Sequence, residues 1–389
     1  MRRDILISTL HTSSWDTNAT NKVVRANNGH LYRFFTDQLF QNISWSKSTD
    51  GGLTWSKPVI LDGGCTAISV WYDRWSDVAG DKIHIAWTVN DLDDTLYQNM
   101  NTASADALSA VTTIFAGAST SVNGTLSIAR ARGGNLFCYT KIDVDTEGVF
   151  ARSTDVGAVW ATRTLPEAIA TADLMILAPG FAADNQDIIG IFWDASANEV
   201  SRYVHDDSAN TWAETSIALL MVENAGINSN FSVEVDLANS RLLLVAWSGT
   251  DVLLANLLCW TVTEGAITAK ANVVTGSIDD QALCAICMDP ISGYWYVAYA
   301  GKTDGSETWL TGVNIYYRVS RDAGTTWSAE LKLNTAAIAP DNMQLLLPCP
   351  RKAGEPMFSY GFNAASGPDN GYLSIDDFQR QAALMIMGG

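Results

Sequence analysis

A turn followed by a short apolar strand recurs seven times along this chain, and this repeat constrains the fold more than any other feature. The copies read NGHLYRFF, GDKIHIAWT, GGNLFCYT, NQDIIGIFW, NSRLLLVAW, SGYWYVAYA and GEPMFSYGF. Their first large apolar residues lie 52, 53, 52, 54, 52 and 63 residues apart, and these residues are Leu31, Ile83, Leu136, Ile188, Leu242, Tyr294 and Met357. A near-constant period of this length indicates one supersecondary unit stacked many times.

Each copy is flanked by further strand-like runs, so that a unit contains four short strands. A single sheet of this kind exposes its faces and edges, and packing similar sheets radially buries the faces and shortens the exposed edges. The sequence therefore predicts one all-β domain over 1–389, a β-propeller of seven four-stranded blades, with six blades as the alternative. The predicted units are 20–65, 66–118, 119–170, 171–222, 223–276, 277–335 and 336–389, with an N-terminal strand at 4–9.

The predicted ring is closed where the two ends of the chain meet. Two segments compete for the outermost strand of the last unit, DILIST near the start of the chain and AALMIM near its end. If DILIST supplies that strand, pairing of the chain termini closes the ring.

The composition agrees with an all-β fold. The chain has 14 Trp, 12 Tyr and 12 Phe beside only 17% charged residues, which suits half-buried pleated surfaces better than helices. No stretch approaches the unbroken apolar run of a membrane helix.

Three units carry a tighter motif, Ser-x-Asp-x-Gly-x-x-Trp, between their third and fourth strands. An Asp carboxylate accepts N–H bonds within its own turn, and Gly supplies the positive φ that such a turn requires. A degenerate fourth copy, DDSANTW, keeps Asp207 five residues before Trp212. The complete copies are Ser48, Asp50, Gly52 and Trp55; Ser153, Asp155, Gly157 and Trp160; and Ser320, Asp322, Gly324 and Trp327.

These motifs resemble the Asp-box (BNR) repeats of the sialidase-like β-propellers, and the resemblance covers nearly the whole chain. In that family the Asp boxes are structural and lie away from the active site. The resemblance therefore implies that the motif residues, Asp207 and Trp212 included, serve the fold. It also leaves the activity open, because the family includes other glycosidases and non-enzymatic members.

The catalytic pattern of sialidases is not found in this sequence. Sialidases hold the substrate carboxylate with three arginines, the first in an Arg-Ile-Pro segment, and no such segment occurs here. Arg25 and Arg33 lie near the expected positions but are several residues out of register, enough to change the side of a strand. A bidentate arginine clamp does not tolerate this displacement. We therefore name no catalytic residue and lean towards a protein that is not an enzyme.

The charge argues against two classes of partner. The chain has 24 Lys and Arg against 42 Asp and Glu, a formal net charge of −18. Such a surface repels phosphate backbones and anionic lipid, so neither nucleic acid nor membrane insertion is expected. The N-terminal residues lack the apolar segment of a secretory signal, so we expect a virion or cytoplasmic location.

Weaker patterns concern metals and ligands. No cofactor is expected, although Asp143, Asp145 and Glu147 alternate before a Gly like the opening of a calcium loop. The Glu that would close an EF-hand is missing, and a solvated acidic loop is the alternative. The C-x-x-C of Cys284 and Cys287 lies in an apolar strand, which favours buried thiols over a metal or redox site.

Three aromatic residues in VWYDRWSD could stack on a sugar ring: Trp71, Tyr72 and Trp75. Packing in the core is the alternative for these side chains. Together the patterns favour a non-catalytic binding or assembly propeller, a phage virion or tail-associated protein that recognises protein partners or a glycan. The alternative is a sialidase-like glycoside hydrolase acting on a terminal sugar.

Overall fold

The structure is a computed structural model of the 389-residue chain. It describes residues 3–8, 22–37, 42–52, 54–72, 80–89, 94–117, 126–141, 148–166, 174–182, 186–194, 197–219, 230–248, 255–277, 283–289, 292–307, 314–333, 343–352, 355–362 and 370–374. In this part of the chain, regular structure consists of β-strands and one 3₁₀ turn, Leu237–Asn239.

Six sheets are each built from consecutive strands, and we call these sheets blades. The first three contain β2 (Val23–Arg25), β3 (Leu31–Asp37), β4 (Asn42–Ser48) and β5 (Val59–Asp62); β6 (Cys65–Tyr72), β7 (Lys82–Val89), β8 (Thr95–Asn101), β9 (Ala107–Leu108) and β10 (Thr112–Phe115); and β11 (Leu126–Arg130), β12 (Leu136–Lys141), β13 (Gly148–Ser153) and β14 (Ala161–Arg163).

The next three blades follow the same antiparallel meander. They contain β15 (Leu174–Pro179), β16 (Ile188–Asp194), β17 (Glu199–Asp206) and β18 (Thr211–Leu219); β19 (Phe231–Asp236), β20 (Arg241–Ser248), β21 (Ala255–Val262), β22 (Ile267–Ala269) and β23 (Val274–Ser277); and β24 (Cys284–Met288), β25 (Trp295–Ala300), β26 (Ile315–Ser320) and β27 (Leu331–Lys332).

A further sheet joins the two ends of the chain, and we call it the composite sheet. It has the order β1 (Arg3–Ser8), β30 (Asn370–Ser374), β29 (Glu355–Phe362) and β28 (Met343–Lys352). β1 is antiparallel to β30, with Arg3 opposite Ser374. The pairing of DILIST with the last strands is therefore present, and AALMIM lies outside the described residues.

The prediction of seven four-stranded blades is wrong, and the alternative of six is the one supported. Six blades are each formed by consecutive strands, and two of them have a fifth strand, β9 and β23. The last repeat supplies only three described strands and depends on β1 for its fourth, so it is not a blade of the same kind.

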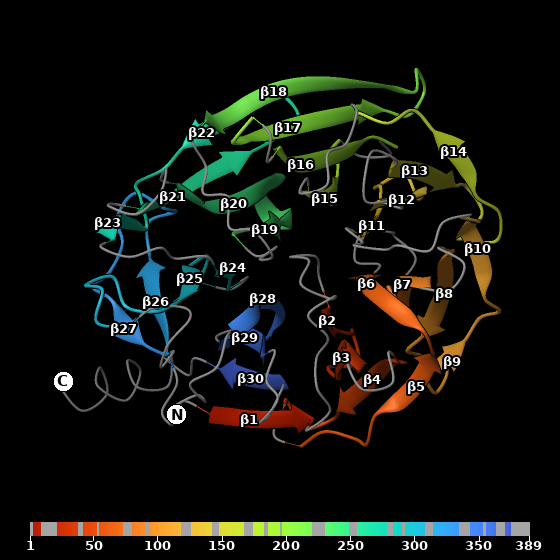
Figure 1. Cartoon of the computed structure of the whole chain (residues 1–389), viewed down its shortest axis with the longest axis horizontal. Coiled ribbons are helices and arrows are strands. Elements are labelled where there is room, and N and C mark those ends of the chain that lie inside the picture. Colours follow the sequence, from red (N-terminus) through yellow and green to blue (C-terminus); the bar gives the residue numbers. More distant parts are fainter. Residues whose placement is uncertain are drawn as a thin grey trace.

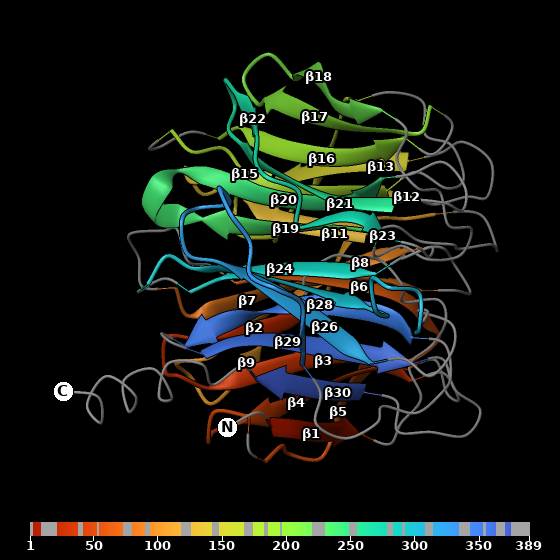
Figure 2. The ribbon, with the colours of Figure 1, turned by 90° about the vertical axis from the view of Figure 1, so that its left-hand side faces the viewer.

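The sheets stand around a common centre, with the first strand of each blade and β28 of the composite sheet innermost (Figure 1). In the side view, the strands of the different sheets run in similar, roughly horizontal directions (Figure 2). Inner strands of neighbouring blades are joined by a repeated serine contact, in which a Ser Oγ accepts the backbone N–H of the next inner strand. The three pairs are Ser69 with Ile128 at 3.2 Å, Ser127 with Leu177 at 2.9 Å, and Ser232 with Ile286 at 3.2 Å.

The hydrophobic core lies between the sheets. The strand alternation turns one set of apolar side chains towards each neighbour, so that each cluster draws on two adjacent sheets. Four tryptophans of the second strands are fully buried there: Trp87, Trp193, Trp247 and Trp295. Cys284 and Cys287 are both buried but belong to different clusters on opposite faces of β24, which excludes a shared two-cysteine site.

Among the described residues, no helix is long and apolar enough to cross a membrane.

Candidate functional site

The three complete Ser-x-Asp-x-Gly-x-x-Trp motifs form the same hydrogen-bonded turn after the third strand of their blades. The Ser hydroxyl donates to the Asp carboxylate at 2.8, 2.7 and 2.9 Å in the first, third and sixth blades. The Gly N–H donates to the same Ser Oγ at 2.8 Å in all three. The residue before Trp donates its N–H to the carboxylate at 2.9 Å. One carboxylate thus organises each turn.

One position distinguishes the three turns. Thr54 and Thr326 each donate a hydroxyl to the second carboxylate oxygen, at 2.6 and 2.7 Å, whereas the third blade has Val159 there. Hydrogen bonds to the ionised form lower the pKa of Asp322 to about 2, the largest contribution coming from Thr326. The N–H of Val159 likewise lowers the pKa of Asp155.

These turns also bind the preceding blade. Thr112 donates its hydroxyl to the carbonyl of Gly157 at 2.7 Å, and Ala271 N–H donates to the carbonyl of Gly324 at 3.0 Å. Trp327 Nε1–H donates to the carbonyl of Ala271 at 2.9 Å. The motif therefore fastens one blade to the next as well as closing its own turn.

The degenerate motif of the fourth blade differs from the prediction. Its turn is organised by Asp206, whose carboxylate accepts the hydroxyl of Ser208 at 2.7 Å and the N–H of Ala209 at 2.9 Å. The structure places Asp207 elsewhere, in an ion-pair network with the third blade. Trp212 does pack against the third blade, donating its Nε1–H to the carbonyl of Thr164 at 2.7 Å.

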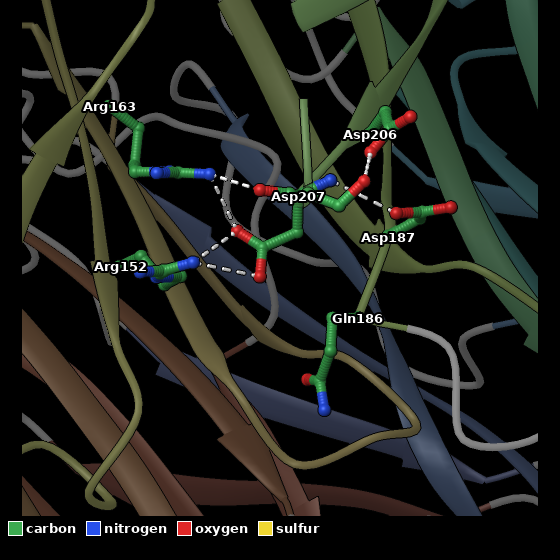
Figure 3. Close-up of a pocket in the computed structure, with 7 residues that line it drawn as sticks. Arg152, Arg163, Gln186, Asp187, Asp206 and Asp207 are labelled. Carbon is green, nitrogen blue, oxygen red and sulfur yellow. Dashed lines mark hydrogen bonds and ion pairs between the residues drawn. The ribbon is translucent and has the colours of Figure 1, made fainter. Parts of the chain in front are cut away.

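Asp207 lies at the boundary between the third and fourth blades. Arg152 Nη1 on β13 is 2.8 and 2.9 Å from its two carboxylate oxygens, and Arg163 Nη2 on β14 is 3.0 Å from Oδ1. Asn135 Nδ2 donates to Oδ2 at 2.9 Å. The Asp207 side chain is only 7% exposed, so the two guanidinium groups offset a nearly buried charge. Figure 3 shows both arginines pointing at this carboxylate.

A cavity of about 590 Å³ opens over this network. β13 and β14 contribute the arginines, the segment before β16 contributes Gln186 and Asp187, and the end of β17 with the turn after it contributes the rest (Figure 3). Each lining residue has a polar or charged side chain, and the set is Arg152, Arg163, Gln186, Asp187, Asp206, Asp207 and Ser208. Hydrogen-bond donors and hydrogen-bond acceptors both line this cavity, which suits a ligand that carries many hydroxyl groups.

The network is anchored to a buried aromatic cluster. His205, immediately before the two aspartates, has no exposed surface and packs edge-on against Phe150 and at a tilt against Trp212, with ring centroids 5.0 and 4.8 Å away. Burial lowers the pKa of His205, outweighing the opposing contributions of Asn210, Asp207 and Asp187. The lowered pKa favours the neutral form of this buried imidazole.

Of the predicted stacking residues, Trp71 and Tyr72 do not line this cavity. Tyr72 is 4% exposed, and its hydroxyl accepts the N–H of Asn27 at 2.7 Å and contacts the carbonyl of Gly80. Trp71 packs against the clusters on either side of the third blade. Trp75 lies outside the described residues. Packing is therefore the role that the structure supports for Trp71 and Tyr72.

The calcium candidates Asp143, Asp145 and Glu147 lie outside the described residues, so the calcium prediction stays open. Within the part that the structure describes, no group of three His, Cys, Asp or Glu side chains is arranged to hold a metal ion.

A tyrosine–glutamate pair occurs in the sixth blade. Tyr299 donates its hydroxyl to Glu330 Oε1 at 2.9 Å, and Arg318 Nε is 3.3 Å from that hydroxyl. Tyr299 has no exposed surface, and burial raises its pKa far above the ordinary value. This phenol is therefore shielded from a substrate and held protonated.

Arg33 is fully buried and donates to the carbonyl of Phe34 at 2.6 Å.

Sequence reasoning missed the cavity because its residues come from four separate segments. One signal was available. Arg152 precedes Ser153 as Lys47 precedes Ser48, and Lys47 Nζ lies 2.7 Å from Asp106 of the following blade. A cation at this position of the motif thus pairs twice with an acidic residue of the next blade.

Solved structures share the fold of this chain at low sequence identity. The alignment with polysaccharide lyase Uly1 covers 96% of this chain and 98% of the lyase, with a TM-score of 0.53 and 11% sequence identity. The alignment with the endosialidase of phage phi92 covers 96% of this chain and 69% of the endosialidase, with a TM-score of 0.53 and 10% sequence identity. The alignment with a triple arginine-to-alanine mutant of AofleA from Arthrobotrys oligospora covers 87% of this chain and 91% of AofleA, with a TM-score of 0.53 and 11% sequence identity. The sequence matches no protein-family model and no curated protein. The likeness shows a common β-propeller fold.

Proposed function

We propose that this chain is a non-catalytic carbohydrate-binding propeller and that the cavity between the third and fourth blades is its glycan site. The observation that carries the proposal is the lining itself. Guanidinium, amide and hydroxyl donors face carboxylate acceptors within one concave site of about 590 Å³. A sugar hydroxyl both donates and accepts, so it needs partners of both types.

The site is also organised before any ligand arrives. Arg152 and Arg163 are held by Asp207, whose own N–H donates to Asp187 Oδ1 at 3.0 Å. Side chains fixed in this way lose little conformational entropy on binding, which favours affinity for a flexible ligand. The names of two structural neighbours, a polysaccharide lyase and an endosialidase, are consistent with a carbohydrate ligand.

The electrostatics favour binding over hydrolysis. A glycosidase needs one carboxyl group that stays protonated near neutral pH so that it can act as an acid. Hydrogen bonds from Ala209 and Ser208 instead lower the pKa of Asp206. The shielded Tyr299 provides no accessible nucleophile. A sialidase-like hydrolase remains the alternative proposal, supported by the fold shared with the phi92 endosialidase.

We further propose that the protein works within an assembly, as a virion or tail component of a phage. The outer strands carry exposed apolar side chains suited to protein contacts, among them Val59 at 44%, Ile60 at 61% and Leu108 at 41%. The phi92 endosialidase is, by its name, a phage protein with a comparable fold.

The glycan proposal is tested by screening the full chain on a printed glycan array and repeating the screen with Arg163→Ala. We expect binding to a subset of glycans and at least a tenfold loss in the variant, because Arg163 both lines the cavity and holds Asp207. Lys47→Ala is the matched control, since it breaks the comparable ion pair of the first and second blades and does not line the cavity. Equal binding by the wild type and Arg163→Ala would refute the site.

The hydrolase alternative is tested on the same samples. The bound glycans are incubated with the wild-type chain and the products are separated by chromatography. Intact glycan after prolonged incubation is the expected result, and release of a terminal sugar that Glu330→Gln abolishes would replace the non-catalytic proposal.

A further inference from the structure

The cavity over Asp207 carries more negative than positive charge. Its lining contains three carboxylates, Asp187, Asp206 and Asp207, against the two guanidinium groups of Arg152 and Arg163. Both arginines lie against the same carboxylate, that of Asp207. The lining therefore has a formal charge of minus one on a chain whose total is −18.

Asp206 contributes a negative charge at the exposed side of this lining. The hydrogen bonds to its carboxylate come from neutral groups, the Ser208 hydroxyl at 2.7 Å and the Ala209 N–H at 2.9 Å. These bonds favour the ionised form without cancelling its charge. The neighbouring His205 adds no positive charge, because it is buried among aromatic rings.

A ligand that enters this cavity meets that charge at short range. A carboxylate on the ligand would be repelled, and the arginines are already engaged with an acceptor inside the protein. A neutral sugar is indifferent to the net charge, and an ammonium group is attracted by it. An acidic sugar would have to share the two arginines with Asp207, whose carboxylate already offsets part of their positive charge.

We infer that the cavity selects neutral and amine-bearing glycans and excludes those that carry sialic or uronic acid. This inference rests on the proposed glycan-binding function and gives the ligand class of the same site. It sets the cavity apart from a site built to hold a substrate carboxylate.

The test compares the wild-type chain with Asp206→Asn on an array of neutral, amine-bearing, sialylated and uronate-bearing glycans. The Asn amide oxygen can still accept the N–H of Ala209, so the turn is kept while one charge is removed. We expect wild-type binding to neutral and amine-bearing glycans only. In the variant, amine-bearing glycans should lose about threefold to tenfold in affinity relative to neutral ones, as expected for one charge at partly screened distance.

Asp322→Asn is the matched control. It removes the same charge from a carboxylate that organises the corresponding turn of the sixth blade, and it does not line the cavity. The control should bind every glycan class as the wild type does.

The outcomes separate the two claims. Preferential wild-type binding of sialylated or uronate-bearing glycans, lost in Arg163→Ala, would overturn the selectivity while leaving a glycan site in place. Binding to no glycan of any class would overturn the proposed function and the selectivity with it. An unchanged ratio of amine-bearing to neutral binding in Asp206→Asn would also contradict the selectivity.

Discussion

Arg152 of the third blade contacts both carboxylate oxygens of Asp207 of the fourth blade, at 2.8 and 2.9 Å, across the boundary between the two sheets. The pair Lys47 and Asp106 spans the boundary between the first and second blades in the same manner, at 2.7 Å. Arg152 and Asp207 both line the cavity, whereas Lys47 and Asp106 do not. The same contact thus serves stability at both boundaries and, in our account, ligand binding at one.

Replacing Asp207 by Ala should destabilise the fold. The change leaves two guanidinium groups without their carboxylate in a nearly buried site, and we expect a loss of about 2–4 kcal/mol. Asp106→Ala should cost less, about 1 kcal/mol, because Asp106 pairs with one more solvated cation, Lys47, and its other carboxylate oxygen accepts the neutral hydroxyl of Tyr32 at 2.6 Å. Urea unfolding followed by tryptophan fluorescence measures both. Equal losses would contradict the role of the second arginine.

Gly157→Ala should be strongly destabilising, by about 2–4 kcal/mol. The residue has φ of +90°, and an added Cβ would overlap the ring of Tyr97 from the preceding blade. Gly51→Ala separates the two causes, since its φ is +74° but nothing lies within 4 Å, so about 1 kcal/mol is expected. Gly265→Ala, with open space and no positive φ, should change stability by less than about 0.5 kcal/mol.

Val159→Thr should stabilise the protein. The valine occupies the position where Thr54 and Thr326 donate to the motif carboxylate, and it is 67% exposed, so its methyl groups bury little. A new hydrogen bond from the hydroxyl to Asp155 should raise the unfolding temperature slightly and lower the pKa of Asp155 further. Thermal unfolding and carboxylate titration by NMR measure the two effects. The reverse change, Thr326→Val, should destabilise and raise the pKa of Asp322.

Mild acid should weaken the fold through His84. Its Nδ1 lies 2.7 Å from the hydroxyl of Tyr97, and complete burial, with the charges of Arg130 and Lys82, holds its pKa well below the ordinary value. A group whose pKa is lowered on folding stabilises the fold above its unfolded pKa of about 6.5, and this stability is lost as the pH falls below that value. The unfolding midpoint in urea should therefore fall between pH 7.5 and 5.5. His84→Gln should flatten this part of the profile, and an unchanged slope would assign the effect to other groups.

Stronger acid should act through the motif carboxylates. The pKa of Asp322 is about 2, below the usual value near 4, so its contribution is present above pH 4 and disappears as the pH falls towards 2. Asp322→Asn should remove this dependence while sparing the loss near pH 6. Urea midpoints between pH 4.5 and 2 provide the measurement.

The repeat could be predicted from the sequence because each unit obeys local rules. Alternating apolar strands, turn glycines and the Ser-x-Asp-x-Gly-x-x-Trp turns leave their pattern within a few residues, as at Ser153, Asp155 and Gly157. The blade number was wrong because the last repeat shares its sheet with β1, a pairing between residues near opposite ends of the chain. Such long-range completion has no local signature.

The cavity could not be predicted for a related reason. Asp207 fits the spacing of the turn motif, yet its neighbour Asp206 takes the turn and Asp207 meets two arginines from another blade. Which of two adjacent aspartates turns inward depends on the packing of the third blade against the fourth. The spacing to Trp212 contains no such information.

The most direct test of the central claim is a crystal structure of the chain soaked with the glycan that binds most strongly on the array. Our account predicts electron density for a sugar in the cavity between the third and fourth blades, with its hydroxyl groups on Arg152, Arg163 and Asp206. Density for that glycan at the mouth of the central channel or on another blade, with this cavity holding only water, would contradict it.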